Sequence, residues 1–135
     1  MPSASWSLQR AIYDVLIADE PVLALLGGAR IYDAVPDNST FPYLTLGQTS
    51  VADWSAGAEA GEEHTLMLHV WSRAQGRRET HELMAALRSA LHERALTLDG
   101  HRLVNLRHEQ SEARREADGL TYHGIARFRA VTEPA

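Results

Sequence analysis

The sequence predicts an α+β domain, with a mostly antiparallel sheet and helices packed on one of its faces. Apolar residues recur at helical spacing in Ser7–Ala18 and Arg77–Arg94. Apolar and polar residues alternate in Glu62–Trp71 and Leu120–Val131, as they do in strands. Asp99-Gly100 separates two short β-prone runs and predicts a tight hairpin. Hairpins join antiparallel strands, so these observations together indicate a helix layer on an antiparallel sheet.

Composition places the chain among ordinary globular proteins. Its 135 residues are 44% hydrophobic and 23% charged, which predicts a single domain over residues 1–135. The absence of cysteine excludes disulfides and cysteine-based zinc sites. A net charge of -5 argues against a dedicated nucleic-acid binder, and the use of arginine for all thirteen basic residues is typical of a GC-rich genome. The longest apolar runs, such as Val22–Leu26, are too short to span a membrane, and Met1–Trp6 lacks the features of a signal peptide, so we expect no membrane association.

The N-terminal half should begin with two helices. Ser5 or Ser7 can cap the Ser7–Ala18 helix. Asp19-Glu20-Pro21 then opens a short helix that stops at Gly27-Gly28. The expected strands that follow are Arg30–Val35, Tyr43–Ser50 and Glu62–Trp71, with Val51–Gly61 as a mobile, acidic loop of small residues.

The C-terminal half should contain the main helix, a hairpin and the last strand. The stripe on Arg77–Arg94 comprises Thr80, Leu83, Met84, Leu87, Ala90 and Leu91, and Arg78 can pair with Glu82 on its solvent side. Leu96–Val104 is the hairpin, with a type I′ turn. The charged segment Glu109–Gly119 is either a hairpin tip or a solvated strand end. In Leu120–Val131, one side carries Leu120, Tyr122, Ala126 and Phe128, and the other carries His123, Arg127 and Arg129.

The start of the main helix is a candidate anion site. A glycine followed by two arginines, Gly76-Arg77-Arg78, can present backbone N–H groups and guanidinium groups to a phosphate. The segment lacks the P-loop lysine and the spacing of a dinucleotide fingerprint. We therefore interpret it as an ordinary strand-to-helix turn with solvated arginines.

Other patterns that carry chemistry are weak in this chain. His81-Glu82 lacks a second histidine four residues after His81, and His64 and His69 should point to opposite faces of their strand, which disfavours a metal site. Glu62-Glu63 borders a loop and is typical of solubilising charge. No Gly-x-Ser-x-Gly elbow is present. The sequence thus predicts no enzyme, no metal and no cofactor.

The Glu62–Trp71 strand is apolar on both faces. Leu66, Leu68 and Val70 face one way, while Met67 and Trp71 face the other, on the same side as His69. Since the helices suffice for one face of the sheet, the second face needs another cover. That cover is either a neighbouring subunit, with Met67, His69 and Trp71 as interface residues together with the sheet edges, or a curled part of the same chain.

The acidic loop offers a further candidate site. Asp53, Trp54 and Glu59 form a candidate docking loop, because an exposed tryptophan is a good anchor for a partner; the alternative is that Trp54 packs on its own domain.

Three segments carry a family resemblance when they are taken in order. RIYDAVPDNSTFPYLTLG, LHVWSR and ALHERALTLDGHRLVNLR hold an Arg-Ile-Tyr after a short helix, a Trp-Ser strand end, and a Leu-x-Leu-x-Gly hairpin after a helix. This order resembles the tail-completion, or tail-terminator, family of long-tailed phages and gene transfer agents. The resemblance spans Ser7 to Val131.

The resemblance implies a structural virion protein with no catalytic residues. It implies a hexameric ring, in which the sheets of adjacent subunits meet, at the end of the tail nearest the head. The ring would cap the finished tail tube, end its polymerisation, and offer a surface to the head-side connector protein. Its partners would be itself, the tube protein and the connector. DNA would pass through without specific binding, so Arg127 and Arg129 should lie away from the axis and pair with acids. In such a ring, Glu62 and Glu63, beside Asp53 and Glu59, are candidate lumen residues. Assembly would take place in the host cytoplasm.

Two other readings remain open at this point. One is a small cytosolic enzyme or ligand-binding α+β module that uses the Arg77-Arg78 helix start and nearby histidines. The other is a different head–tail joining protein on a similar fold.

Overall fold

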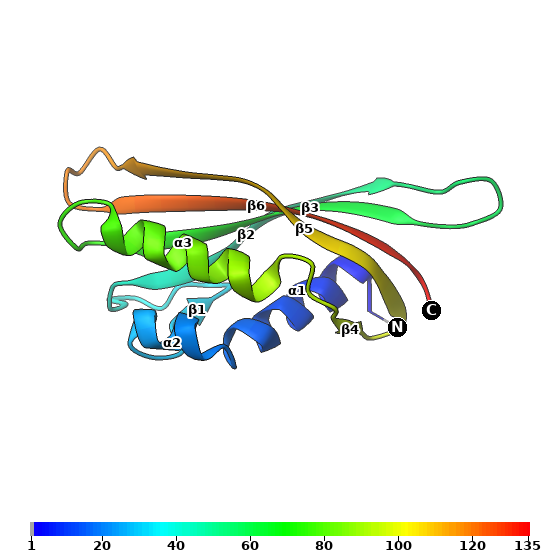
Figure 1. Cartoon of the computed structure of the whole chain (residues 1–135), viewed down its shortest axis with the longest axis horizontal. Coiled ribbons are helices and arrows are strands. Elements are labelled where there is room, and N and C mark those ends of the chain that lie inside the picture. Colours follow the sequence, from blue (N-terminus) through cyan, green and yellow to red (C-terminus); the bar gives the residue numbers. More distant parts are fainter. Residues whose placement is uncertain (1) are drawn as a thin grey trace.

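The computed structural model describes residues 2–135 and confirms the α+β class (Figure 1). A twisted six-stranded sheet has the order β1-β2-β3-β6-β5-β4, and only the β1–β2 pair is parallel. The three helices lie on one face of the sheet (Figure 1). The elements are α1 (Ala4–Leu16), α2 (Glu20–Leu26), β1 (Ile31–Tyr32), β2 (Tyr43–Asp53), β3 (Glu62–Ser72), α3 (Arg78–Leu91), β4 (Thr97–Leu98), β5 (His101–Arg115) and β6 (Tyr122–Pro134).

The helices form where the periodicity predicts them, but one cap differs. Ser3, not Ser5 or Ser7, caps α1 by accepting a hydrogen bond from the Trp6 N–H. Ser7 is buried and donates its hydroxyl to the Asp99 carbonyl at 3.0 Å. The short helix α2 behaves as predicted, with Asp19 as its N-cap and a left-handed Gly27 after its last residue.

Strand lengths depart from the prediction at several points. The expected Arg30–Val35 strand pairs with β2 only at Ile31 and Tyr32. β2 continues to Asp53, because its polar tail pairs with the start of β3; the predicted loop thus shrinks to a hairpin tip. β5 extends through Arg115. Of the charged segment Glu109–Gly119, the first part therefore belongs to the strand, and the part from Glu116 forms the turn that follows it.

The two C-terminal turns also correct the prediction. Gly100 has a φ of 77° but Asp99 does not have a positive φ, so the hairpin turn between β4 and β5 is not type I′. Leu120 lies in the turn before β6 and is 64% exposed, so it does not belong to the buried side of that strand. Tyr122, Ala126 and Phe128 do lie on the helix-covered side.

The core occupies the space between the helices and the sheet. The predicted stripe of α3 is buried throughout, against Leu66, Leu68 and Val70 of β3. α3 approaches β6 so closely that a Cβ at Gly124 would lie 2.8 Å from the Met84 sulfur. Apolar burial on this face therefore accounts for the stability of a single subunit. Within residues 2–135, no helix is both long and apolar enough to cross a membrane.

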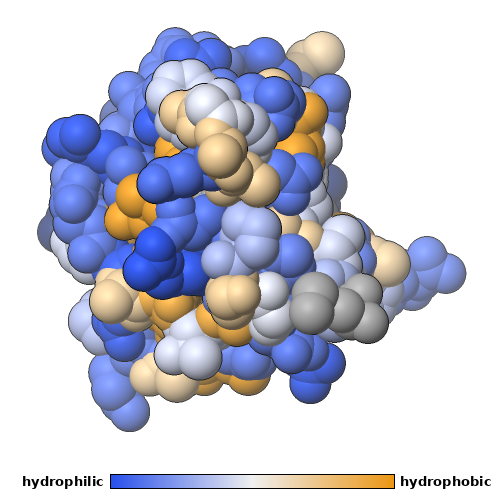
Figure 2. All heavy atoms as spheres, turned by 90° about the vertical axis from the view of Figure 1, so that its right-hand side faces the viewer, coloured by the Kyte–Doolittle hydropathy of each residue, from blue (hydrophilic) through white to orange (hydrophobic). Residues whose placement is uncertain are grey.

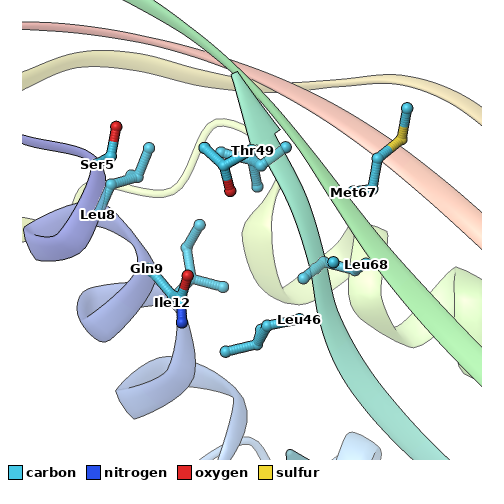
Figure 3. A pocket seen from close by; sticks show the side chains of 10 residues that line it. Ser5, Leu8, Gln9, Ile12, Leu46, Thr49, Met67 and Leu68 are labelled. Atoms are coloured by element: carbon cyan, nitrogen blue, oxygen red, sulfur yellow. The ribbon is translucent and has the colours of Figure 1, made fainter. Parts of the chain in front are cut away.

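A small cavity between α1 and the sheet interrupts this packing (Figure 3). It measures about 20 Å³, and Leu8, Ile12, Leu46 and Leu68 surround it, whereas the Met67 side chain points away from it (Figure 3). It has room for one water molecule at most, so it is a packing defect and not a ligand site.

Candidate functional site

The helix-free face of the sheet holds an aromatic cluster near the end of β3. Trp71 stacks on His123 of β6, with ring centroids 3.8 Å apart and an angle of 11°. His69 stacks against both rings, and Tyr43 of β2 stacks against Trp71. The Trp71 indole N–H donates to the Thr45 hydroxyl at 3.1 Å. We call Tyr43, His69, Trp71 and His123 the aromatic face; it contains two of the three predicted interface residues.

Hydrogen bonds fix the two histidines of the aromatic face. His123 Nδ1 lies 2.7 Å from a Glu116 carboxylate oxygen, and His123 Nε2 lies 2.7 Å from His69 Nδ1. Because a carboxylate only accepts, Nδ1 of His123 carries the proton, and a neutral His123 then accepts from the His69 Nδ1–H. Burial lowers the pKa of both histidines; for His69 the neighbouring His123 adds to this effect, whereas for His123 the Glu116 carboxylate opposes it. The pair is thus held neutral, with a defined proton arrangement.

Gly47 of β2 holds His69 from the other side. A Cβ at Gly47 would lie 2.4 Å from His69 Nε2, so the imidazole occupies the space that any other residue would fill. Only glycine allows this close approach, and the aromatic face depends on it.

Met67, the third predicted interface residue, lies nearer the start of β3 than His69 and Trp71 and is half-buried on the same face. It stands opposite Arg127 of β6. Arg127 lies 3.4 Å from Glu109, and Arg129 lies 2.6 Å from Glu63. The prediction that these two arginines pair with acids is confirmed within the subunit.

The β2–β3 hairpin tip carries the predicted docking residues. Trp54 is 53% exposed, and the Arg129 guanidinium lies 4.9 Å from the centroid of its ring. A cation over the ring face orients Trp54 without burying it. Asp53 accepts hydrogen bonds from the Ser55 N–H and hydroxyl, and Glu59 bridges to Ala56 through the backbone. The hairpin protrudes at one end of the molecule, where hydrophilic residues cover most of the surface and hydrophobic ones form separate spots (Figures 1 and 2).

The predicted lumen residues separate in the structure. Glu63 lies on the helix-free face, paired with Arg129, whereas Glu62 is exposed on the opposite side of β3. Alternation along the strand keeps the two carboxylates apart, so they form no pair for acid–base chemistry.

The start of α3 has its arginines engaged in ordinary contacts. The Arg77 guanidinium lies 5.6 Å from the Tyr122 ring centroid, and Arg78 pairs with Glu82 at 3.5 Å, as predicted. Two grooves, of about 470 and 450 Å³, lie beside α1, and neither is lined by the Gly76-Arg77-Arg78 turn. Among residues 2–135, no group of three or more histidine, aspartate and glutamate side chains has the arrangement that could hold a metal ion.

Sequence reasoning missed part of the aromatic face. It placed His123 on the side of Arg127 and Arg129, which is confirmed, but did not bring it against Trp71. That contact follows from the β3–β6 register, which pairs strands far apart in the chain. Gly47 meets His69 through the β2–β3 pair, and Glu116 reaches His123 across the β5–β6 turn, so neither role left a local signal.

Comparisons with known proteins agree with the fold. The family model described as tail completion protein gp17 matches residues 10–133. The tail completion protein gp17 of Bacillus phage SPP1 is 25% identical over 126 residues, which cover 93% of this chain and 92% of that protein. Among solved structures, a chain from the virion of a native gene transfer agent particle superposes with a TM-score of 0.90 at 34% identity, covering 98% of this chain and 99% of that one. This chain belongs to the tail completion protein gp17 family.

Proposed function

We propose that the protein is a structural component of a virion tail, where it caps the tail tube as a homohexameric ring. The ring ends polymerisation of the tube and joins the tail to the head-side connector protein, at the end of the tail nearest the head. It assembles in the host cytoplasm and works without a cofactor. The observation that carries the proposal is the match, over nearly all of both chains, to a chain of a gene transfer agent virion. Membership of the tail completion family supports the same role.

The helix-free face supplies the contact between subunits in this proposal. Trp71, His69 and Met67 are half-buried on a sheet face that no helix covers. Aromatic residues and methionine are enriched in the cores of protein interfaces. A neighbouring subunit therefore covers Met67, His69 and Trp71.

The hairpin tip supplies the contact with the tube protein or the connector. Trp54 is exposed at the end of a protruding arm and is oriented by Arg129. Large aromatic side chains that are already held in place are effective anchors, because little side-chain entropy is lost on binding. Asp53 and Glu59 form the polar rim of this contact.

The channel of the ring lets DNA pass without holding it. Each arginine that contacts a phosphate adds affinity that depends on salt and not on sequence, and such contacts would slow passage. The net charge of -5 on each subunit, with Arg127 and Arg129 paired to Glu109 and Glu63, leaves little free positive charge for such contacts. Glu62 and Glu63 line or border the channel. The purified protein should show no appreciable affinity for duplex DNA at physiological salt; tight, salt-dependent binding would contradict this role.

Deletion of the gene from cells that produce the particle tests the proposed function. Loss of a tail terminator should yield tails of uncontrolled length that carry no heads, and the wild-type gene supplied in trans should restore both properties. Tails of normal length without heads would assign the protein to head–tail joining alone. Normal particles would refute the proposal. They would favour the alternative hypothesis of a ligand-binding or enzymatic role at the start of α3.

The copy number in the particle gives a second readout. Quantitative mass spectrometry of purified tails should find several copies per tail, in the ratio that a hexamer predicts. A single copy per tail would rule out a ring.

A further inference from the structure

Each edge of the sheet has a segment that no strand of the described chain covers. On one edge, β1 pairs with β2 only at Leu44 and Thr45. On the other edge, β4 pairs with β5 only at His101 and Arg102. Beyond these short contacts, both edge strands continue for many residues with one side unpaired.

The open segment of β2 is Gln48–Asp53, and all six of its residues are exposed. It consists of small or uncharged residues up to Asp53. Exposed edges of this kind normally carry lysine, proline or a covering loop, since unpaired backbone groups recruit other strands. The uncharged edge of β2 is therefore suited to receive a partner strand.

The direction of its backbone groups follows from one hydrogen bond. The Trp54 N–H donates to the Gly61 carbonyl at 2.8 Å, so the backbone N–H of Trp54 points toward the opposite strand of the hairpin. Bonded and non-bonded pairs alternate along antiparallel strands. Ser50 and Ala52 then bond to β3, whereas Thr49, Val51 and Asp53 direct their N–H and C=O groups outward.

Only part of the β5 edge is open, because two of its residues form hydrogen bonds with the segment that follows α3. The Leu106 carbonyl accepts from the Glu93 N–H at 2.7 Å, and the His108 N–H donates to His92 Nδ1 at 2.9 Å. His92 and Glu93, which follow α3, thus satisfy the outward backbone groups of Leu106 and His108. The open part of the edge is Glu109–Arg115.

Several charged side chains on this part of β5 are engaged within the subunit. Glu109 pairs with Arg127 of β6, and Arg114 pairs with Glu116, so these two charges are compensated. Arg115 donates to the Gly119 carbonyl in the turn that follows β5.

We propose that Gln48–Asp53 of one subunit pairs, edge to edge, with Glu109–Arg115 of a second copy of this chain. β2 and β5 run in opposite directions in the sheet, so a neighbour in the same orientation meets β2 in antiparallel fashion. The pairing is head-to-tail, which is the kind of contact that closes into rings. A self-pairing of two β2 edges would instead give a dimer and leave the β5 edge uncovered.

The geometry of the pairing also requires a shift along the strands. The β2 segment lies at the hairpin end of the molecule and the β5 segment lies towards the β5–β6 turn at the other end (Figure 1). Neighbours are therefore staggered, as in closed sheets whose strands tilt from the axis. The neighbour's hairpin then arrives beside His123 of the aromatic face, which is opposite Arg114 of β5. This inference rests on the proposed ring and identifies the strands that join it.

Cysteine cross-linking in assembled tails tests the pairing, since the natural chain has no cysteine. Particles are produced with an equal mixture of Ser50→Cys and Glu112→Cys chains and treated with a short bismaleimide. Ser50 is opposite Thr65 and Glu112 is opposite Ile125, so both side chains lie on the helix-free face. Paired strands lie about 4.8 Å apart, so the two thiols come within its reach. The control replaces Glu112→Cys with Ser89→Cys, at an exposed position on α3.

The expected result is a covalent dimer with the Ser50→Cys and Glu112→Cys mixture and none with the control. Two results overturn the inference: no cross-link in tails that contain several copies of the protein, or a cross-link with Ser50→Cys chains alone, which means a self-paired β2 edge. A single copy per tail refutes the ring itself, so the two failures are distinguishable.

Proline at Val51 provides an independent measurement. Val51→Pro removes an outward N–H but no hydrogen bond inside the subunit, and proline is tolerated at such edge positions. Val51→Ala, which keeps the N–H, is the control. With both variants folded, Val51→Pro should lower the yield of completed particles by roughly tenfold or more, because an interface hydrogen bond is lost at every contact in the ring. Equal yields for the two variants would contradict the pairing.

Discussion

The two faces of the sheet carry different kinds of side chain. The helix-covered face is formed by aliphatic residues and Phe128, which is fully buried and meets His108 edge to face at 5.4 Å. The helix-free face holds stacked rings, histidines held neutral, and arginines paired with acids, most of them half-buried.

This difference separates folding from assembly. Apolar burial scales with the area removed from water, and the helix-covered face has nearly all of it. The helix-free face pairs Arg127 and Arg129 with acids but leaves Arg127 Nε and Asn105 Oδ1 without a hydrogen bond within residues 2–135. It also leaves ring faces and Met67 for a partner. Substitutions on the first face should thus change stability, and substitutions on the second should change assembly.

Truncation of Phe128 should have the largest effect. Phe128→Ala leaves a cavity under α3 and should destabilise the subunit by about 3–5 kcal/mol. For a chain of this size that corresponds to a fall in Tm of roughly 10 °C or more, measured by circular dichroism. Ile125→Ala, on the helix-free side of the same strand, is the matched control and should cost less than half as much. Equal losses would mean that the two faces contribute alike to folding.

Acidification should have the next largest effect. Burial lowers the pKa of His64, His69, His108 and His123 in the folded state. The unfolded chain, with ordinary pKa values near 6.5, then binds more protons below that pH. The stability linked to these histidines is complete above about pH 6.5 and is lost as the pH falls through the lowered pKa values. Tm should therefore decrease between about pH 7.5 and pH 5.

His69→Gln sharpens the same comparison. It removes one of the coupled histidines of the aromatic face and should make Tm less dependent on pH over that range. His81→Gln, at an exposed site on α3, serves as the control. A Tm that stays constant for the wild type would show that the aromatic face tolerates protonation.

A charge at Met67 should affect assembly more than folding. In Met67→Asp the new carboxylate stands opposite Arg127, which can compensate it in the free subunit. Stability should change by no more than about 1 kcal/mol. A charge buried at an interface without a partner is costly, so ring formation should fail. Met67→Leu should assemble like the wild type, and normal rings from Met67→Asp would exclude this face from the interface.

Loss of Trp54 should have the smallest effect on stability. The side chain is half exposed and contacts Arg129, so Trp54→Ala should leave Tm nearly unchanged while tails remain unterminated or unjoined. Trp54→Phe keeps a ring under the guanidinium and should retain partial function. A large decrease in Tm for Trp54→Ala would instead show that the tip is part of the core.

The sequence predicted the elements that local chemistry determines and missed those that depend on pairing. The stripe of α3 and the caps Asp19 and Gly27 follow from spacing and from single residues, and they are confirmed. The extension of β2 to Asp53 depends on its pairing with the next strand, β3, and the contact of His123 with Trp71 depends on β3 and β6, which are distant in the chain. For the site, alternation along β3 predicted that Met67, His69 and Trp71 share one face. It did not predict the residues that hold the His69 and Trp71 rings in place. Their assignment to a subunit interface remains a prediction.

The positions of the chain ends have a practical consequence for imaging. His101 Nε2 lies 3.0 Å from the Pro2 carbonyl oxygen, and His101 is paired with Pro134, so the two ends of the chain are neighbours at the hairpin end (Figure 1). A gold particle or fluorescent protein fused at either end would mark the same pole of the subunit. Micrographs of particles labelled in the two ways should therefore superimpose, and the marked pole would show directly which way each subunit points along the tail.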